Sequence, residues 1–370
     1  MSRRARPIVI AGGGTAGHVM PALAVADALV ARGRDRATVR FVGSRRGIEA
    51  RLVPQAGYAV TLLPGRGVER RASWRALAAA AGLAAATAAE IVAMARERPA
   101  AVLSVGGYAA WPCAVAALVL RVPLVVAEAN AVPGAANRLA ARWAKASAVA
   151  FDGTGLPRSV LTGTPVRDDV RRVSRDPEAR RNARTELGIE PGRHLVAVTG
   201  GSLGARRINE AVFDLVERWS DRDDVAVHHA LGARDWTALG PRRPAPDKLQ
   251  YQAVEYEERV PTLLSAADVW VGRAGGVTVA ELTAVGVPSV LVPLPIAPHD
   301  HQGVGARRLA AAGACRVVPD PDCTGERLAA ELAPLIASPA ALDAMAAAAA
   351  RAGHRDAADR IAELLEAHAA

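Results

Sequence analysis

Short apolar runs alternate along the chain with longer, alanine-rich segments. The runs have the length of buried strands and the segments have the length of crossover helices, so the pattern predicts parallel α/β sheets. The predicted strands are Ile8–Ala11, Thr38–Val42, Ala101–Val105, Leu124–Glu128, Ala148–Phe151, Leu195–Thr199, Val225–Ala230, Leu249–Gln252, Val269–Gly272 and Ser289–Pro293. Helices are predicted between most of them, for example over Pro21–Arg32, Trp74–Arg98 and Ala205–Arg218.

The elements fall into two groups, because 370 residues are many for a single core. The first five predicted strands form one group, and glycine, proline and threonine concentrate after them, near residues 153–167. We therefore expect an N-terminal domain over residues 1–160 and a C-terminal domain over residues 161–338. A helix at about residues 340–370 is expected to pack back on the N-terminal domain. Each half has its own glycine-rich strand-to-helix turn, which suggests two similar halves that face a cleft.

Composition narrows the class of protein without identifying it. The net charge is +9, but lysine occurs only at Lys145 and Lys248, and so one-sided an arginine bias is typical of GC-rich coding. Aromatic residues make up 4% and are not interleaved with basic runs, so we expect no nucleic-acid partner. The three cysteines show neither metal-ligand spacing nor a paired framework, which fits a reducing compartment.

One stretch has the length of a membrane span. Residues 102–120 carry no charge, but they contain Gly106-Gly107 and Pro112, which would expose broken backbone to lipid. A strand, a glycine turn and a buried helix explain this stretch better. We also find no signal-peptide pattern at the N-terminus.

The first candidate site is the turn from Gly12 to His18, between a predicted strand and a predicted helix. Backbone N–H groups at such a helix start can hold a phosphate. The turn also satisfies G-x-G-x-x-G, and the second strand is followed by two arginines instead of an acidic residue, so an NADP-binding oxidoreductase is an alternative. His18 favours sugar transfer, which needs a base beside the diphosphate. A helix-start histidine bonded to backbone is the plain alternative.

Two further glycine turns lie in the second half. In Gly200–Gly204, Ser202 can donate to a phosphate oxygen, and Arg167 at the end of the linker can clamp a diphosphate. The turn at residues 273–281 enters a helix, and Glu281 lies about one turn inside it, where it can accept both hydroxyls of a ribose. The structural alternatives are a tight turn that needs small residues and an acidic residue stabilised by the helix dipole.

Taken in order, these motifs resemble the MurG family of peptidoglycan N-acetylglucosaminyltransferases, in glycosyltransferase family 28, over almost the whole chain. The motifs that carry the resemblance are Gly12–His18, Gly106-Gly107-Tyr108, Glu128 with Asn130, Gly163–Arg167, Gly200–Ala205 and Gly275–Glu281. The resemblance implies a glycosyltransferase-B fold, with two Rossmann-like α/β domains facing a cleft. It also implies inverting transfer of N-acetylglucosamine from UDP-N-acetylglucosamine to the muramic acid 4-hydroxyl of lipid I, which gives lipid II.

The resemblance also assigns residues to roles. It makes His18 the favoured base or diphosphate contact and Glu128 a second catalytic residue. The implied donor-binding residues are Thr15, Ala16, Gly17, Asn130, Arg167, Ser202, Glu257, Gly276, Val277, Thr278, Val279, Ala280, Glu281 and Gln302. The implied contacts of the acceptor diphosphate are Gly13, Gly14, His18 and Tyr108. Gln302 would hold sugar hydroxyls, and backbone near Glu257 would read the uracil edge.

The chain departs from the family pattern at two places. It has Ala127-Glu128-Ala129-Asn130 where the family usually has His-Glu-Gln-Asn, and the run of Gln and Asn after Gln302 is reduced. A divergent paralogue with a specialised acceptor, or an enzyme that tailors a soluble natural product, is therefore an alternative. A UDP-N-acetylglucosamine 2-epimerase has a related fold, but normally requires acidic catalytic residues that the first turn lacks.

The implied acceptor carries an undecaprenyl lipid, so we expect a peripheral protein on the cytoplasmic face of the cell membrane. Arg66, Arg70, Arg71 and Arg75 flank Trp74 just before an apolar helix, where arginines can meet anionic headgroups while the indole enters the interface. The alternative is a buried helix with a solvated arginine face. We expect no obligatory metal, and no cofactor besides the donor substrate.

Overall fold

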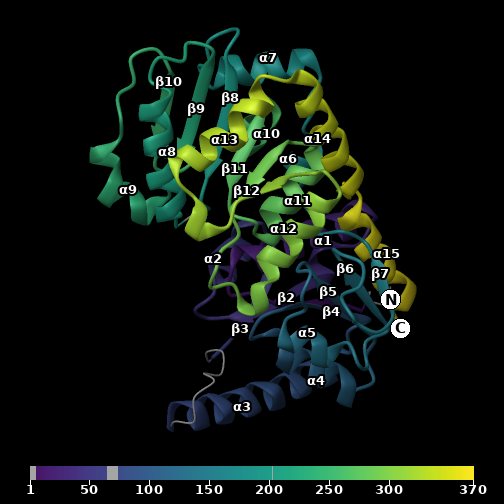
Figure 1. The fold of residues 1–370 in the computed structure, drawn as a ribbon. Helices are drawn as coiled ribbons and strands as arrows, with labels where there is room; N and C mark the ends of the chain where they lie inside the picture. The colour runs from purple at the N-terminus through teal and green to yellow at the C-terminus, as the bar shows by residue number, and fades with distance from the viewer. Residues whose placement is uncertain (1–5, 65–73, 202) are drawn as a thin grey trace. The chain divides into compact units, whose positions relative to one another are not determined.

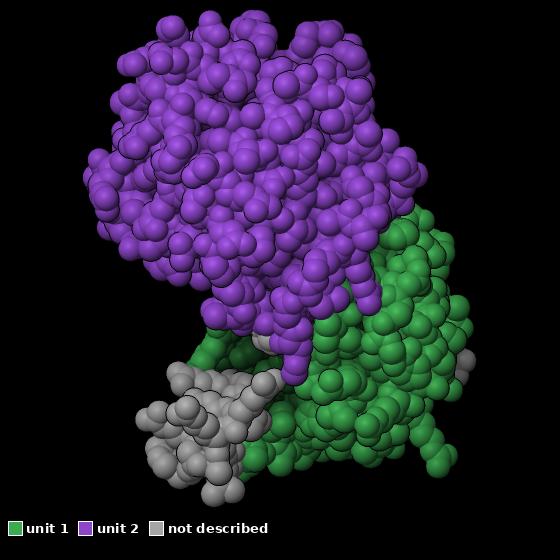
Figure 2. All heavy atoms as spheres, viewed as in Figure 1, with its two compact units in different colours: residues 1–167, 354–370 green, residues 168–353 purple. Residues whose placement is uncertain are grey.

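The computed structural model describes residues 6–64, 74–201 and 203–370 (Figure 1). The chain divides into two compact units, which Figure 2 colours separately. Unit 1 comprises residues 1–167 and 354–370, and unit 2 comprises residues 168–353. The chain thus changes unit later than the expected 160/161 boundary, and it returns at 353/354.

The described part of unit 1 is built on a seven-stranded sheet in which all paired strands are parallel, in the order β3-β2-β1-β4-β5-β6-β7. Its strands are β1 (Ile8–Gly12), β2 (Val39–Ser44), β3 (Ala59–Leu63), β4 (Ala101–Gly106), β5 (Leu124–Glu128), β6 (Ala146–Val149) and β7 (Ser159–Leu161). The chain winds outward from β1 to β3 and then resumes beside β1 with β4. The strand order therefore reverses between β1 and β4, and a crevice at their carboxyl ends is the usual ligand site of such a sheet.

Helices cover both faces of this sheet. They are α1 (Ala16–Ala31), α2 (Glu49–Gln55), α3 (Trp74–Glu97), α4 (Ala110–Val119), α5 (Ala135–Ala140) and α15 (Ala357–His368), with a 3₁₀ turn at Arg36–Thr38. On one face α1 and α15 pack together, and Leu29, Ile361 and Leu365 are buried in one core with β1 and β4. On the other face α3 and α4 pack together, and Met94 and Cys113 are buried in a second core. The apolar stretch 102–120 is therefore β4 followed by the mostly buried α4, as predicted.

Unit 2 repeats the plan with a six-stranded sheet of parallel pairs among its described residues, in the order β10-β9-β8-β11-β12-β13. Its strands are β8 (His194–Thr199), β9 (Val225–Ala230), β10 (Gln250–Val254), β11 (Val269–Gly272), β12 (Ser289–Leu291) and β13 (Arg316–Val317). Its helices are α6 (Asp168–Arg171), α7 (Pro177–Glu186), α8 (Arg206–Arg218), α9 (Ala233–Leu239), α10 (Val260–Ala266), α11 (Gly276–Val285), α12 (His301–Ala311), α13 (Gly325–Ile336) and α14 (Pro339–Ala352), with 3₁₀ turns at Gly240–Arg242, Pro298–Asp300 and Asp320–Asp322. Here the strand order reverses between β8 and β11.

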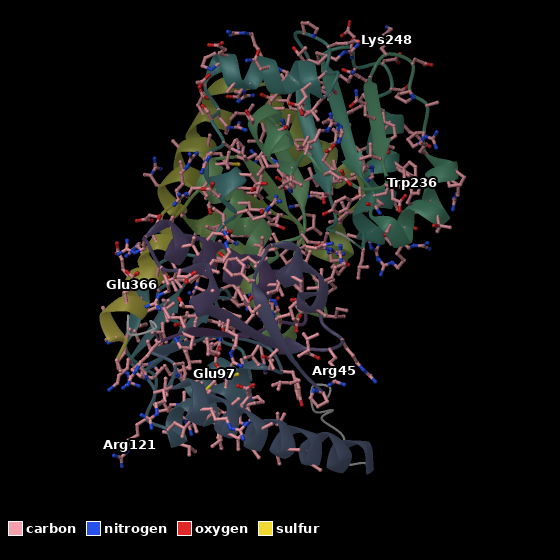
Figure 3. All side chains as sticks on the ribbon, turned by 180° about the vertical axis from the view of Figure 1, so that it is seen from behind. Arg45, Glu97, Arg121, Trp236, Lys248 and Glu366 are labelled. Atoms are coloured by element: carbon pink, nitrogen blue, oxygen red, sulfur yellow. The ribbon has the colours of Figure 1, made fainter. Side chains whose placement is uncertain are left out.

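The C-terminal segment is not a single helix but two, α14 and α15, and they belong to different units. In unit 2, α14 packs on α11 and α13, with Leu342 and Met345 in the core. The chain then crosses back after Gly353, and α15 alone joins unit 1, where Arg32 pairs with Glu363 and Glu366. Figure 3 labels Glu366 on this helix. The break falls where Gly353 ends α14 in extended backbone.

All the predicted strands are confirmed, with ends shifted by two residues at most. The strands that the pattern missed are β3, β7 and β13, which lie at the edges of their sheets, and β7 and β13 are also very short. The prediction that the first helix begins at Pro21 was wrong. It begins at Ala16, and Pro21 lies inside it. Proline also fits a first helical turn, which is why the sequence pattern suggested the later start.

Among the described residues, no single helix is long and apolar enough to cross a bilayer. One sharply bent pair, Gly325–Ile336 with Pro339–His368, meets the criterion by length and composition only.

Candidate active site

Each unit has one place where the strand order reverses, and the glycine turns found in the sequence lie there. In unit 1 the turns after β1 and β4 meet, and in unit 2 the turns after β8 and β11 follow adjacent strands. A crevice at such a point receives backbone N–H groups from helix starts on neighbouring strands. These two places are the candidate sites, and each is described within its own unit.

The two glycine turns of unit 1 are in direct backbone contact. Gly13 N donates to Gly106 O at 3.2 Å. A Cβ at Gly12 would overlap Gly106 O, and a Cβ at Gly107 would overlap Gly13 O. Both positions also have positive φ, so glycine is needed here for space and for backbone conformation. The close approach of the turns brings the start of α1 beside the end of β4.

The imidazole of His18 lies directly above this contact. Its Nδ1 is 3.1 Å from Gly13 O and 3.4 Å from the Thr15 hydroxyl. A carbonyl oxygen only accepts, so the closer contact requires a proton on Nδ1. In the neutral ring, Nε2 is then the nitrogen that carries the lone pair and can take a proton.

The amides of Gly13 and Gly14 are already used inside the protein. Gly13 N donates to Gly106 O, and Gly14 N donates to the carboxylate of Glu49 at 2.8 Å. The N–H groups of Thr15, Ala16 and Gly17 come next, at the start of α1, where a helix has no acceptor of its own for them. A diphosphate at this turn would therefore meet residues 15–17, and any contact with Gly13 or Gly14 would not be through their N–H groups.

Glu128, predicted as a catalytic residue, is 5% exposed and accepts four hydrogen bonds. One oxygen accepts from the backbone and side-chain nitrogens of Asn130, and the other from Gly134 N and from Asn137 Nδ2. Asn137 also donates to Ala127 O and accepts from the Ser104 hydroxyl. These bonds tie the carboxylate to the turn after β5, and its catalytic role stays a prediction.

A mostly apolar pocket in unit 1 lies next to these groups. It is lined by Gly17, His18, Ala127, Glu128, Ala129 and Thr164, among others. Both alanines that depart from the family pattern thus face the same pocket as His18. Tyr108 does not line this pocket. Its hydroxyl donates to Pro64 O at 2.9 Å, and burial raises its pKa.

In unit 2 the turn after β8 makes a similarly close approach. A Cβ at Gly204 would overlap Leu231 O, and a Cβ at Gly232, after β9, would overlap Gly204 N. Gly201 N donates to the Thr199 hydroxyl at 3.1 Å. Ser202, predicted to bind a phosphate, lies outside the described residues.

The start of α11 faces a second pocket, which holds about 140 Å³ and is lined by residues that include Thr199, Gly201, Tyr256, Glu257, Thr278 and Glu281. No side chain caps this helix, so the N–H groups of Gly276, Val277 and Thr278 have no acceptor within it. Val279 is buried and Ala280 is half-buried. Glu281 lies beyond the first turn of α11, so the helix dipole does not account for an acidic residue there.

Glu257 lines the same pocket, but its side chain points inward and is 6% exposed. One oxygen accepts from Arg259 N at 2.7 Å, and the other lies 2.7 Å from His228 Nε2. Burial acts to raise the pKa of Glu257, but the backbone and guanidinium N–H groups of Arg259 and the charge of His228 outweigh it, so the pKa is lowered. Tyr256 beside it is exposed at the pocket.

Gln302 is the second residue of the helix α12, and its amide oxygen accepts from Leu294 N at 2.9 Å. This bond directs the amide group, and leaves the NH₂ end as the one that can donate to a hydroxyl. Just before it, His299 and Asp300 both adopt left-handed backbone, which is costly for residues other than glycine. Strain of this kind is typical of binding turns. Arg167 is half-buried at the end of unit 1.

Among the residues that the structure describes, no group of three or more His, Cys, Asp or Glu side chains could hold a metal ion. The sequence does contain Asp-x-Asp at 221–223 and at 320–322. Neither belongs to such a group, and Asp320 pairs with Arg273.

Sequence reasoning missed Glu49, Asn137 and His228, which are buried and contact the predicted site residues or the turns that carry them. Their partners are distant along the chain, so no local pattern marks them. Three glycines, at positions 13, 43 and 47, surround the Glu49 carboxylate, but the sequence alone does not reveal what they make room for.

Two family models match the chain: the glycosyltransferase family 28 N-terminal domain over residues 8–149 and the glycosyltransferase family 28 C-terminal domain over residues 195–361. A relative from Clavibacter sepedonicus is 42% identical over 96% of this chain and 95% of its own. A relative from Streptomyces coelicolor is 39% identical over 95% of both chains. Both are named UDP-N-acetylglucosamine–N-acetylmuramyl-(pentapeptide) pyrophosphoryl-undecaprenol N-acetylglucosamine transferase.

Solved structures agree with the fold. Acinetobacter baumannii MurG matches with a TM-score of 0.76 at 28% identity, over 97% of this chain and 98% of its own. The calicheamicin glycosyltransferase CalG4 matches with a TM-score of 0.67 at 18% identity, over 99% of this chain and 98% of its own, which supports the fold alone. The predicted fold class, two parallel-sheet α/β domains of glycosyltransferase-B type, is confirmed.

Proposed function

The chain belongs to glycosyltransferase family 28, and we propose that it transfers N-acetylglucosamine from UDP-N-acetylglucosamine to the muramic acid 4-hydroxyl of lipid I, giving lipid II. The observation that carries this proposal is the 42% identity, over 96% of the chain, to a relative named for that transfer. Neither an NADP-binding oxidoreductase nor a natural-product glycosyltransferase is favoured by these matches.

On the donor side, the pocket of unit 2 supports binding of the nucleotide. The amides of residues 276–278 at the start of α11 are suited to the diphosphate, and Ser202 is proposed to donate to it as well. Glu281 faces the same pocket and can accept from both ribose hydroxyls. Tyr256 offers an exposed ring at the pocket against which a base can stack, and Gln302 is proposed to hold the sugar.

On the acceptor side, the start of α1 supports binding of the lipid-linked diphosphate through the amides of residues 15–17. His18 is proposed as the base that takes the proton from the attacking 4-hydroxyl, a role worth roughly 10²–10⁴ in rate. With a proton on Nδ1 that is held by Gly13 O, its Nε2 is the basic nitrogen. The hydroxyl then attacks the anomeric carbon from the face opposite UDP, which inverts that centre.

As UDP leaves, its diphosphate gains negative charge. Helix N–H groups and Arg167 are proposed to stabilise that charge electrostatically, the kind of contribution that metal ions make in other transferases. We therefore expect full activity without an added metal. Loss of transfer in EDTA that magnesium restores would contradict this expectation.

We also propose that unit 1 binds an anionic membrane surface peripherally, on the cytoplasmic side, because the acceptor is membrane-held. The predicted arginines 66, 70 and 71 lie outside the described residues, and the side chains of Trp74 and Arg75 are not described either. The described residues add support of their own at the end of α4. Leu118 and Val119 are 49% and 56% exposed, and Arg121 follows them and points away from the ribbon (Figure 3).

The deciding experiment offers labelled UDP-N-acetylglucosamine to the full chain with a soluble lipid I analogue. We expect a labelled disaccharide product with an inverted, β-linked centre. Donor binding without transfer to lipid I, but with transfer to another acceptor, would support the specialised paralogue that Ala127 and Ala129 suggested. Absence of donor binding would contradict the proposed function altogether.

A further inference from the structure

A buried carboxylate lies beneath the first glycine turn, and neither the family motifs nor the mechanism above uses it. Glu49, the first residue of α2, is 1% exposed. We propose that Glu49 is a positioning residue, which orients the peptide between Gly13 and Gly14. That peptide in turn holds His18 in the tautomer that has its proton on Nδ1 and its lone pair on Nε2. This inference rests on the proposed function for its catalytic consequence, but its structural part can be tested without it.

Both oxygens of Glu49 accept hydrogen bonds from backbone N–H groups. Its Oε2 accepts from Gly14 N at 2.8 Å, and its Oε1 accepts from Ser44 N at 2.7 Å. Hydrogen bonds from N–H groups to an ionised carboxylate are stronger than neutral ones, and burial strengthens them further. The carboxylate thus ties the turn after β1 to the end of β2.

The surrounding glycines are shaped to this carboxylate. A Cβ at Gly13, at Gly43 or at Gly47 would overlap the side chain of Glu49. Three glycines from two segments of the chain, one of them inside β2, therefore leave room for one side chain. A glutamate that served only to start the short helix α2 would not require this space.

The link to His18 runs through one peptide group. Gly14 N–H and Gly13 C=O belong to the same planar trans peptide, so they point in opposite directions. While Glu49 holds the N–H, the carbonyl is directed to the other side, where it accepts from His18 Nδ1 at 3.1 Å. That acceptor fixes the proton on Nδ1 and leaves Nε2 basic.

An anchor is needed at this place because the peptide lies between two glycines. Gly13 and Gly14 have φ of 147° and 97°, and glycine reaches several such conformations at little cost. Without an acceptor for its N–H, the peptide can rotate and withdraw its carbonyl from His18. The imidazole would then lose the contact that selects its tautomer.

The test is Glu49→Gln in the full chain, with Glu366→Gln as the matched control, since Glu366 pairs with Arg32 at the surface of the same unit. The glutamine amide has one oxygen and one NH₂ group, so it can accept from only one of the two backbone N–H groups. The NH₂ group then faces the other N–H, and that hydrogen bond is lost. We expect kcat to fall at least tenfold with the KM for UDP-N-acetylglucosamine unchanged. We also expect ¹⁵N NMR of labelled histidine, with His18 assigned by its loss in His18→Asn, to show a mixture of tautomers.

If Glu49→Gln does not fold, Gly14→Ala tests the same peptide with the carboxylate intact. A Cβ at Gly14 meets no atom within 4 Å, so this change strains only the backbone. We expect the same tautomer shift. If kcat and the tautomer both match the wild-type protein in the folded variants, the positioning role is wrong. If instead the wild-type protein transfers no sugar while the tautomer shifts as expected, the proposed function fails and the positioning role stands.

Discussion

His228 Nε2 lies 2.7 Å from Glu257 Oε2, and both side chains are almost fully buried. On its other side, His228 Nδ1 is 3.1 Å from Gln252 Oε1, whose amide is oriented by its own bond to Gly188 O. Both nitrogens of the ring thus face oxygen atoms. The approach of His228 Nε2 to Glu257 does not have hydrogen-bond geometry, so the ring nitrogen lies close against the carboxylate oxygen without a hydrogen bond to it.

This pair predicts the effect of a change at Glu257. Glu257→Ala removes the acceptor for Arg259 N and frees the loop that lines the pocket of unit 2. We expect the Kd for UDP to rise about tenfold, which is a loss of about 1.4 kcal/mol, measured by titration calorimetry. Glu258→Ala is the control, because that neighbouring side chain is exposed. Equal affinity of the two variants would contradict the positioning role of Glu257.

The proposed role of His18 as the base predicts that its removal lowers kcat and leaves donor binding unchanged. His18→Ala should lower kcat by roughly 10²–10⁴ while UDP still binds, since the residue contributes to proton transfer rather than to donor affinity. His194→Ala serves as the control, because His194 begins β8, at the end of that strand opposite the glycine turn. Retention of more than a third of the wild-type rate in His18→Ala would rule out its role as the base.

The buried His229 predicts an acid sensitivity of unit 2. Burial, and next the charge of His228, lower its pKa from 6.5 to about 3. Below pH 6.5, His229 therefore binds a proton in the unfolded chain but not in the folded one. The free energy of unfolding falls as the pH drops through this range. Between pH 6.5 and pH 5 the loss should be about 2 kcal/mol.

Hydrogen exchange of β9 amides, corrected for intrinsic rates, measures this loss. In His229→Gln the pH dependence should be flatter by that amount, although the variant also loses contacts to Asn209 and Tyr251 and is less stable at neutral pH. His194→Gln should keep the wild-type slope. An unchanged slope in His229→Gln would show that other groups cause the acid sensitivity.

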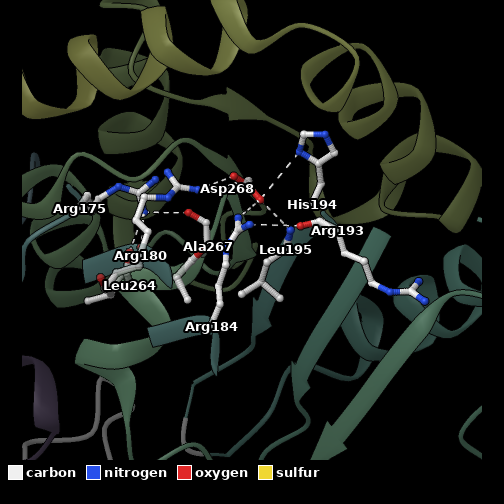
Figure 4. A network of polar contacts seen from close by, with 11 residues as sticks. Arg175, Arg180, Arg184, Arg193, His194, Leu195, Leu264, Ala267 and Asp268 are labelled. Carbon is white, nitrogen blue, oxygen red and sulfur yellow. Dashed lines mark hydrogen bonds and ion pairs between the residues drawn. The ribbon is translucent and has the colours of Figure 1, made fainter. Parts of the chain in front are cut away.

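The guanidinium of Arg175 predicts a second stability effect (Figure 4). Its Nη1 donates to Leu264 O at 2.7 Å and to Ala267 O at 2.8 Å, at the C-terminal end of α10. Burial lowers its pKa to about 9, so it stays charged at neutral pH. Arg175→Met leaves these carbonyls unpaired and should cost about 2–3 kcal/mol.

Urea denaturation at pH 7.5 tests this prediction, with Arg181→Met on the exposed side of α7 as the control. Neither substitution removes the ion pairs of the nearby Asp268 with Arg180 and Arg184. The difference in stability between the two variants therefore reports the contribution of Arg175. A loss no larger than that of the control would mean that water replaces the guanidinium without cost.

The proposed membrane surface predicts a change in lipid binding that leaves the donor site alone. Leu118→Asp with Val119→Asp, and separately Arg121→Glu, should reduce flotation with phosphatidylglycerol liposomes at low salt, because the first removes apolar insertion and the second removes attraction. Arg351→Glu on α14 is the charge-matched control. If Arg70→Glu with Arg71→Glu abolishes flotation and the other variants do not, the surface lies at the predicted arginines instead.

The local pattern of the sequence was sufficient for the plan of the fold and for the place of its chemistry. Strands such as Leu124–Glu128 and Val269–Gly272 were predicted with their observed bounds, because a parallel strand that is buried on both faces is a nearly continuous apolar run. The glycine turns were found for a similar reason. A turn between a strand and a helix that packs closely against another backbone segment needs residues without a Cβ. These glycines lie close together in the sequence, so the motif is visible there.

Only the tertiary structure decided which groups in those turns are available and what holds them. The amides of Gly13 and Gly14 looked suited to a diphosphate, but Gly106 and Glu49 occupy them. Glu128 stays a predicted catalytic residue, and the structure adds that Asn137 and the turn after β5 donate hydrogen bonds to its oxygens. Such partners come from other strands and helices, and a chain's sequence carries periodicity and local geometry but not the identity of the distant side chain that meets each polar atom when the core closes.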